Sequence, residues 1–197
     1  LSKIILLPPL PEQKKIAKIL SLLDQSIDFV QKKLSKLSNL KKATINQLMI
    51  HGINHIKFKE SVYGQIPKNW RVENLGDFAK ITKLAGFEYT EHFDYSVGGE
   101  IIALRVLNLV DGKINLDNIQ TIPRSVSNSL PRSKLFCDDI LISYVGTVGQ
   151  LGFVEENDRF HLAPNVAKIS CDSEKVNSRF IFYQLLTEMS QENIKNL

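Results

Sequence analysis

The sequence predicts an α+β protein in which a long, coiled-coil-forming helix is followed by a mixed, mostly antiparallel α+β domain. Two observations predict this fold class. From about residue 11 to residue 51, apolar residues recur every three or four positions, which is typical of a helix. From residue 70 onward, short apolar runs alternate with turn residues, which is typical of strands. We therefore divide the 197 residues into a strand-like start (1–13), a helix (14–51), a linker (52–69) and an α+β domain (70–197).

The first eleven residues, LSKIILLPPLP, form an apolar run that is closed by prolines. Pro8 and Pro9 exclude a helix interior at this point, whereas Pro11 suits the first turn of the helix that follows. Glu12 then places a carboxylate near the positive end of the helix dipole. We expect the run to behave as a strand that completes a sheet, either in its own domain or in a neighbouring one.

The helix carries an apolar seam with the spacing of a coiled coil. Alternating steps of four and three residues select ten positions, of which Lys41 and Thr44 are the two polar ones. The other eight are Ile16, Leu20, Leu23, Ile27, Val30, Leu34, Leu37 and Leu48. At ~1.5 Å per residue the rod is about 57 Å long, whereas a 100-residue domain is only ~26 Å across. A second helix is therefore the expected partner of the seam, and a helix that lies along its own domain is the alternative.

Residues 52–69 are polar and contain Gly52, Gly64 and Pro67, which favours a linker. The strands expected after it are 78–82, 100–107, 139–145, 151–154 and 166–170, and the last helix is expected over about 177–190. Asp111-Gly112 and the glycines at 146, 149 and 152 suit strand reversals.

The net charge of +4 is unevenly distributed. Residues 1–59 contain 11 lysines and 3 acidic residues, a net charge of +8, which suits a polyanion or an acidic protein surface. Residues 60–197 contain 14 basic and 18 acidic residues, a net charge of −4. Because phosphate contacts supply most of the affinity for DNA, any DNA-binding function of this second part requires a local basic face.

The two cysteines, Cys137 and Cys171, are too few for a disulfide framework. We expect both to be reduced, Cys137 to be buried, and the protein to be cytoplasmic. No run approaches the roughly 18 apolar residues that a membrane span requires. Because the chain starts at Leu1, we expect it to be a fragment.

Signatures of catalysis are absent from the sequence. It contains no phosphate-binding GxxxxGK[ST] loop, no GxGxxG after a first strand, no GxSxG and no HExxH. His51 and His55 have a spacing that a metal could use, but Gly52 lies between them and no third ligand is near. Asp138-Asp139 lacks the Glu-x-Lys partner of nuclease sites, so a turn before a strand is expected there. We therefore expect no catalytic residue and no metal site.

Several stretches resemble the specificity subunits of type I restriction-modification systems. Residues 7–17, LPPLPEQKKIA, are similar to the signature that closes one target-recognition domain and opens the spacer helix. Residues 64–70 (GQIPKNW) and 75–77 (LGD) resemble the entry into the next recognition domain. Four further stretches resemble one type of that domain: 81–90, 104–108, 139–147 and 162–167. Asp138 departs from the glycine that this family has before the strand, and the chain ends shortly before the family's closing strand.

The resemblance implies sequence-specific DNA recognition by a non-catalytic subunit. Residues 1–13 would end a preceding recognition domain, 14–51 would be the spacer helix, and 70–197 would be a target-recognition domain that is incomplete at its C-terminus. The partners implied are double-stranded DNA, methyltransferase (modification) subunits and a restriction subunit. No cofactor is expected in this chain, because S-adenosylmethionine, ATP and Mg belong to the partner subunits. Since full subunits have two recognition domains and two antiparallel spacer helices, we expect a homodimer in which the eight apolar seam residues form the interface.

The candidate DNA-binding side chains are donors and acceptors expected on loops and strand ends. Arg and Asn suit guanine and adenine edges, whereas Lys and Thr suit phosphates. The candidates are Lys80, Lys83, Arg105, Asn108, Arg132, Lys134, Tyr144 and Thr147. Each could instead be an ordinary surface or strand-capping residue. We also expect Gly86 and Phe87 to shape a neighbouring loop. Lysines 32, 33, 36, 41 and 42 could face DNA, a modification subunit or only solvent.

Two other functions remain open from the sequence. The chain could be the recognition portion of a fused restriction-methylation enzyme, whose methyltransferase motif would lie upstream of residue 1. Alternatively, it could be a coiled-coil adaptor that binds protein, which the negative charge of residues 60–197 favours.

Overall fold

The computed structural model describes residues 4–84 and 98–196. The chain divides into two compact units, Leu1–Thr44 and Ile45–Leu197, and each is described by itself. The structure contains a long helix followed by a mixed, mostly antiparallel set of strands and short helices, which confirms the α+β class. Among the described residues, no helix is long and apolar enough to cross a membrane.

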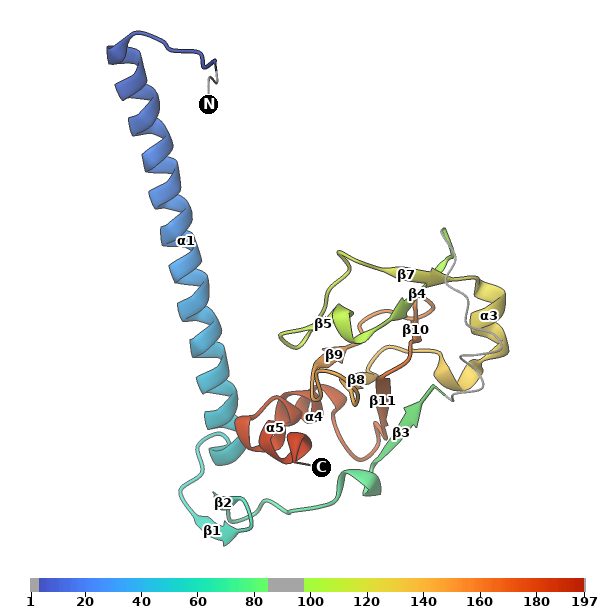
Figure 1. Cartoon of the computed structure of the whole chain (residues 1–197). Coiled ribbons are helices and arrows are strands. Elements are labelled where there is room, and N and C mark those ends of the chain that lie inside the picture. The colour runs from blue at the N-terminus through green and yellow to red at the C-terminus, as the bar shows by residue number, and fades with distance from the viewer. Residues whose placement is uncertain (1–3, 85–97, 197) are drawn as a thin grey trace. The chain divides into compact units, whose positions relative to one another are not determined.

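Helix α1 (Leu10–His51) is continuous and provides nearly all of the regular structure of the first unit (Figure 1). It begins four residues before the expected start, because the carbonyl oxygen of Pro9 accepts hydrogen bonds from the backbone N–H groups of Glu12 and Gln13. It ends where Gly52 adopts a φ of 65°. A side chain at Gly52 would also collide with Trp70 and His55, so this position requires glycine for two reasons. Residues 4–9, expected to be strand-like, form no strand.

Within the described residues of the first unit, no other element covers the apolar stripe of α1. No residue of the helix is buried, and the eight seam side chains are 41–61% exposed. In proteins, a helix gains most of its stability from the packing of its apolar face against another element. The structure therefore leaves a long apolar face that a further helix could cover.

The second unit starts with the last turns of α1 and a small hairpin. Strands β1 (Phe58–Ser61) and β2 (Gly64–Pro67) pair antiparallel within the stretch interpreted as a linker. Two edge-to-face ring contacts hold this hairpin and the chain around it: the ring of His51 contacts Phe58, and the ring of His55 contacts Trp70. The interpretation of 52–69 as a linker stays a prediction, but part of it has regular structure.

A four-stranded antiparallel sheet with the order β3-β11-β8-β9 is the centre of this unit. Its strands are β3 (Ala79–Lys83), β11 (Val166–Cys171), β8 (Ile140–Ser143) and β9 (Leu151–Phe153). All four lie where strands were expected. Gly146 and Gly149 have φ values of 78° and 86° in the β8–β9 connection, which confirms the expected strand reversal.

A three-stranded sheet and a second hairpin complete the strands. Strand β4 (Ile101–Leu104) pairs parallel with β10 (Phe160–Leu162) and antiparallel with β7 (Gln120–Ile122). The hairpin β5 (Leu109–Val110) and β6 (Lys113–Ile114) turns at Asp111-Gly112, as expected. The strand predicted over 100–107 ends early, because residues 106–108 form the 3-10 turn η2 (Val106–Asn108).

Two hydrophobic clusters cover opposite faces of the four-stranded sheet. Leu141 belongs to the cluster shared with the three-stranded sheet, together with Leu104, Ile122 and Leu162. Its neighbour Ile140 belongs to the second cluster, with Phe153, Ile169, Ile181 and Phe182. This alternation follows from the two-residue period of a strand. The remaining short elements are η1 (Leu75–Asp77), α3 (Arg124–Ser129) and η3 (Pro131–Ser133).

The last helix is divided in two, so the prediction of one helix over 177–190 is wrong. Helix α4 (Ser178–Leu185) is followed by α5 (Glu188–Lys195). Thr187 lies between them and is fully buried. Its hydroxyl group donates to the carbonyl oxygen of Gln184 and accepts from the backbone N–H of Ser190, so it closes one helix and caps the next. A further bond ties the N-terminus of α5 to the second unit's part of α1, where the Glu188 N–H donates to Oδ1 of Asn46.

A buried ion pair stabilises the start of β8. Asp139 accepts hydrogen bonds from the Phe136 N–H (2.9 Å) and from the hydroxyl group of Ser170. The ammonium group of Lys168 lies 3.6 Å from the carboxylate, and the two side chains are only 10% and 6% exposed. Asp138, where the resembling family has glycine, adopts a φ of 70°, which glycine adopts freely and which Asp tolerates better than most residues.

Cys137 is exposed, so the expectation that it is buried is wrong. It precedes the left-handed Asp138 in a loop outside the sheet, where its N–H donates to Oδ1 of Asn157. Cys171, at the end of β11, is half-buried, and burial raises the pKa of its thiol. The carboxylate of Asp139 also raises this pKa, whereas a hydrogen bond with Ser178 opposes the shift.

The two thiols should therefore react at different rates. We expect iodoacetamide at mildly alkaline pH to alkylate Cys137 several-fold faster than Cys171, because only the thiolate is nucleophilic and Cys171 is both less accessible and harder to ionise. Mass spectrometry of peptides from the folded protein measures both rates. Equal rates would contradict the placement of the two residues, and equal rates in denaturant are the control.

Candidate nucleic-acid interface

Three strand ends of the four-stranded sheet meet at one edge. Strand β3 ends at Lys83, β8 ends at Ser143, and β11 begins at Val166, which pairs with Ser143. Here the ammonium group of Lys83 lies 4.3 Å from the centre of the Tyr144 ring. Lys83 is exposed and Tyr144 is half-buried. The pair presents a cation and an aromatic hydroxyl group together, and both can contact a nucleic-acid backbone.

Thr147 is presented by a turn that internal hydrogen bonds fix. The Ser143 hydroxyl group donates to the carbonyl oxygen of Thr147 and accepts from the Gln150 N–H (2.9 Å). The carbonyl oxygen of Ser143 accepts from the Gly149 N–H (3.0 Å). The exposed Thr147 therefore lies on a pre-organised turn that starts at the end of β8, three residues after Tyr144, and precise recognition requires such a fixed position.

The side chains of Arg105 and Asn108 form hydrogen bonds within the protein. Asn108 is 1% exposed, and its amide group donates to the carbonyl oxygens of Asn115 and Asn118 and accepts from the Arg105 N–H. The guanidinium group of Arg105 donates to the carbonyl oxygen of Asn118 at 2.8 Å. The side chain of Asn108 thus holds the 105–118 loop and does not reach the surface, whereas Arg105 is partly exposed.

The other basic candidates lie along β3 and η3, which contact each other. Lys80 is exposed on β3, opposite Ser170, and Arg132 is exposed in η3. Lys134 is half-buried and donates to Oδ1 of Asn128 at 2.6 Å. The structure therefore places Lys80 and Arg132 on elements that contact each other, whereas Lys80 and Lys83, three residues apart on β3, lie on opposite faces of the strand. Gly86 and Phe87 lie outside the described residues, and lysines 32, 33, 36, 41 and 42 are all exposed on α1.

Asn165 and Asn118 were not among the predicted residues. Asn165 is exposed, adopts a φ of 71°, and accepts the Tyr144 N–H at its carbonyl oxygen (3.1 Å). Asn118 is exposed and accepts hydrogen bonds from both Arg105 and Asn108. Proline followed by asparagine suits the two central positions of a type II turn, so the Pro164-Asn165 dipeptide could have marked the first of them.

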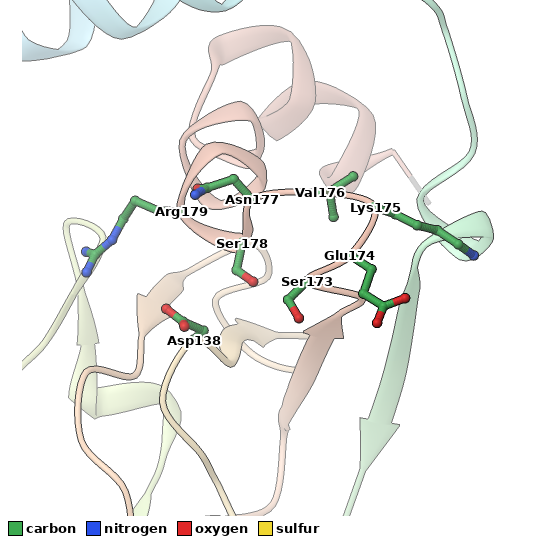
Figure 2. A pocket seen from close by; sticks show the side chains of 8 residues that line it. All are labelled: Asp138, Ser173, Glu174, Lys175, Val176, Asn177, Ser178 and Arg179. Atoms are coloured by element: carbon green, nitrogen blue, oxygen red, sulfur yellow. The ribbon is translucent and has the colours of Figure 1, made fainter.

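A pocket of about 310 Å³ lies on another part of this unit, between the Asp138 turn and the start of α4 (Figure 2). Its two cations already have partners. Arg179 pairs with Glu155 at 2.9 Å, and Lys175 lies 3.5 Å from Asp172. Within residues 4–84 and 98–196, no group of three or more His, Cys, Asp or Glu side chains is placed to hold a metal ion.

Comparison with known proteins defines the class. Residues 2–39 match the family model described as the type I restriction modification DNA specificity domain. The chain is 31% identical, in an alignment over 197 residues, to the specificity subunit of the type I restriction enzyme MjaVIII from Methanocaldococcus jannaschii, and the alignment covers 97% of this chain and 45% of that protein. A putative MjaX specificity subunit from the same organism is 34% identical over 180 residues, covering 91% of this chain and 40% of that protein.

The chain is thus a homologue of type I restriction specificity subunits. It is also similar to the EcoBI specificity subunit of Escherichia coli, with 26% identity over 94% of this chain and 41% of that protein. Among solved structures, the HsdS subunit from Thermoanaerobacter tengcongensis matches with a TM-score of 0.48 and 16% identity, covering 96% of this chain and 44% of that one. The chain spans a little under half the length of the curated relatives that it matches.

Proposed function

We propose that this chain supplies DNA sequence recognition to a type I restriction-modification complex and is not itself an enzyme. One observation carries the proposal: 97% of the chain aligns with a specificity subunit at 31% identity. In this proposal the edge formed by Lys83, Tyr144 and Thr147 contacts DNA, and the basic residues near β3 bind phosphates.

The apolar stripe of α1 pairs, in the proposal, with the same stripe of a second copy. If the two helices run antiparallel about residue 32, Val30 lies opposite Leu34 and Ile27 lies opposite Leu37. The two polar seam positions, Lys41 and Thr44, then lie opposite Leu23 and Leu20. In a parallel pair each Lys41 would face its twin, and two like charges in an apolar seam repel each other. The exposure of the stripe and the position of Lys41 therefore favour an antiparallel homodimer.

The proposal assigns the chemistry to other proteins. Methyltransferase subunits would hold S-adenosylmethionine, and a restriction subunit would use ATP and Mg. The complex would act in the cytoplasm, where double-stranded DNA is its substrate. A dimer with two recognition units would read an inverted target of two parts.

Selection from a pool of random duplexes at moderate salt tests this function. The expected result is enrichment of one two-part motif. Binding without sequence preference would contradict the proposal, because phosphate contacts alone give affinity without specificity. No binding to any duplex, together with a stable protein partner, would favour the adaptor function instead.

A further inference from the structure

We infer that Asn165 reads a base edge, and that it prefers adenine, in the DNA that the Lys83–Tyr144 edge contacts. The inference rests on the proposed function and adds a specificity-determining residue to it. It combines three observations: the backbone of Asn165 is fixed, its amide group has no hydrogen-bond partner among the described residues, and its neighbours suit DNA.

The backbone of Asn165 is held on both sides by the core. Residues 163–165 connect β10 to β11, and Leu162, Ala163 and Val166 on either side of the turn are all fully buried. The Ala163 N–H donates to the carbonyl oxygen of Leu104 at 3.2 Å. Together with the bond from Tyr144 to Asn165, this places the turn between the ends of β4 and β8. A side chain on this turn has a defined position, which base recognition requires.

The amide group of Asn165 is available for a ligand. Its side chain is exposed and makes no hydrogen bond with any residue in 4–84 or 98–196. An asparagine amide has one acceptor and donors side by side, and this arrangement matches N6 and N7 of adenine in the major groove. Its backbone neighbour Tyr144 is part of the cation–aromatic pair with Lys83, which can hold the DNA backbone beside it.

The left-handed backbone of Asn165 provides a clean test. Five described residues other than glycine have a positive φ: Asn54, Asp111, Asp138, Asp158 and Asn165. Three of them are aspartates, whose charge would be repelled by phosphates. Asn54 has the same side chain and a φ of 57°, but it follows the end of α1 at His51 and lies far in sequence from the ends of β3, β8 and β11. Asn54 is therefore a matched control for Asn165.

Duplex selection with the full chain, two variants of Asn165 and the control variant Asn54→Gly tests the inference. Asn165→Gly keeps the backbone conformation without strain and removes the amide group. We expect this variant to keep its melting temperature and its affinity for random duplex, and to lose discrimination at one adenine position by about 5- to 150-fold. Asn165→Asp replaces the donor with a second acceptor and should shift that position towards cytosine, whose N4 group donates. Asn54→Gly should select the same motif as the unaltered chain.

The outcomes separate the inference from the proposed function. If the unaltered chain enriches a motif and Asn165→Gly enriches the same motif with the same strength, the inference is wrong and the proposed function stands. A uniform loss at every position, with a lower melting temperature, would assign Asn165 a purely structural role and also overturn the inference. If the unaltered chain enriches no motif, the proposed function fails, and the inference fails with it.

Discussion

Replacing Leu23 and Val30 together with glutamate should convert the protein from a dimer to a monomer in sedimentation. Both side chains belong to the apolar stripe and are exposed in the single chain, at 56% and 53%. In the proposed antiparallel pair Val30 lies near the middle of the seam, opposite Leu34 of the second copy, so a dimer of the variant would bury the two carboxylates at position 30 without partners. The carboxylates at position 23 would face Lys41 of the second copy and would lose the apolar contact that Leu23 makes in the proposed seam. Burying unpaired charge costs several kcal/mol for each group.

The expected effect is large and specific to the seam. We expect association to weaken by at least about 4 kcal/mol, or roughly 1,000-fold in Kd. The matched control is Gln25→Glu with Asn39→Glu, which adds the same charge on the opposite face of the helix. This control should remain a dimer. A dimer that survives Leu23→Glu/Val30→Glu would show that the seam is not the interface.

Replacing Asp139 with alanine should lower the free energy of unfolding by about 3–5 kcal/mol, because it leaves the Lys168 ammonium group buried without its carboxylate. The change also removes the acceptor of the Phe136 N–H and of the Ser170 hydroxyl group. Urea unfolding followed by circular dichroism measures the loss.

A surface pair serves as the control for Asp139. Glu156 pairs with Arg159 at 2.6 Å, but both side chains are at least 40% exposed. Glu156→Ala should therefore cost only about 0–1 kcal/mol. A second variant, Asp139→Leu with Lys168→Met, removes both charges and should recover part of the loss. Similar costs for Asp139→Ala and Glu156→Ala would contradict the importance of the buried pair.

The sequence predicts best those elements whose apolar residues follow a regular spacing or form a run. The seam of α1 repeats over more than thirty residues, so its period is enough to predict a helix from the sequence. Strand β8 begins with three consecutive apolar residues, and β11 is mostly apolar with Lys168 in its middle; both lie next to turn residues and were expected. The β1–β2 hairpin was not expected, because its strands are four residues long and mostly exposed and therefore lack an apolar pattern.

Tertiary contacts explain the remaining differences. Leu185 and Leu186 continue the apolar pattern of α4, so the break at Thr187 depends on hydrogen bonds that sequence spacing does not reveal. In the candidate interface, the sequence indicates residue types that suit DNA, but it does not show which of these side chains already form hydrogen bonds within the protein. Asn108 has such a side chain, but its amide group binds the carbonyl oxygens of a neighbouring loop. Asn165, whose amide group is free of the described residues, lies in a turn that only the pairing of β8 with β11 brings to Tyr144.

Duplex selection carried out in parallel with the unaltered chain and with Leu23→Glu/Val30→Glu tests most directly whether paired helices hold two DNA-reading units. The unaltered chain is predicted to enrich two inverted half-sites at one fixed spacing. The variant is predicted to enrich a single half-site, with weaker binding. A single undivided site for the unaltered chain, or an unchanged two-part motif for the monomeric variant, would contradict the account.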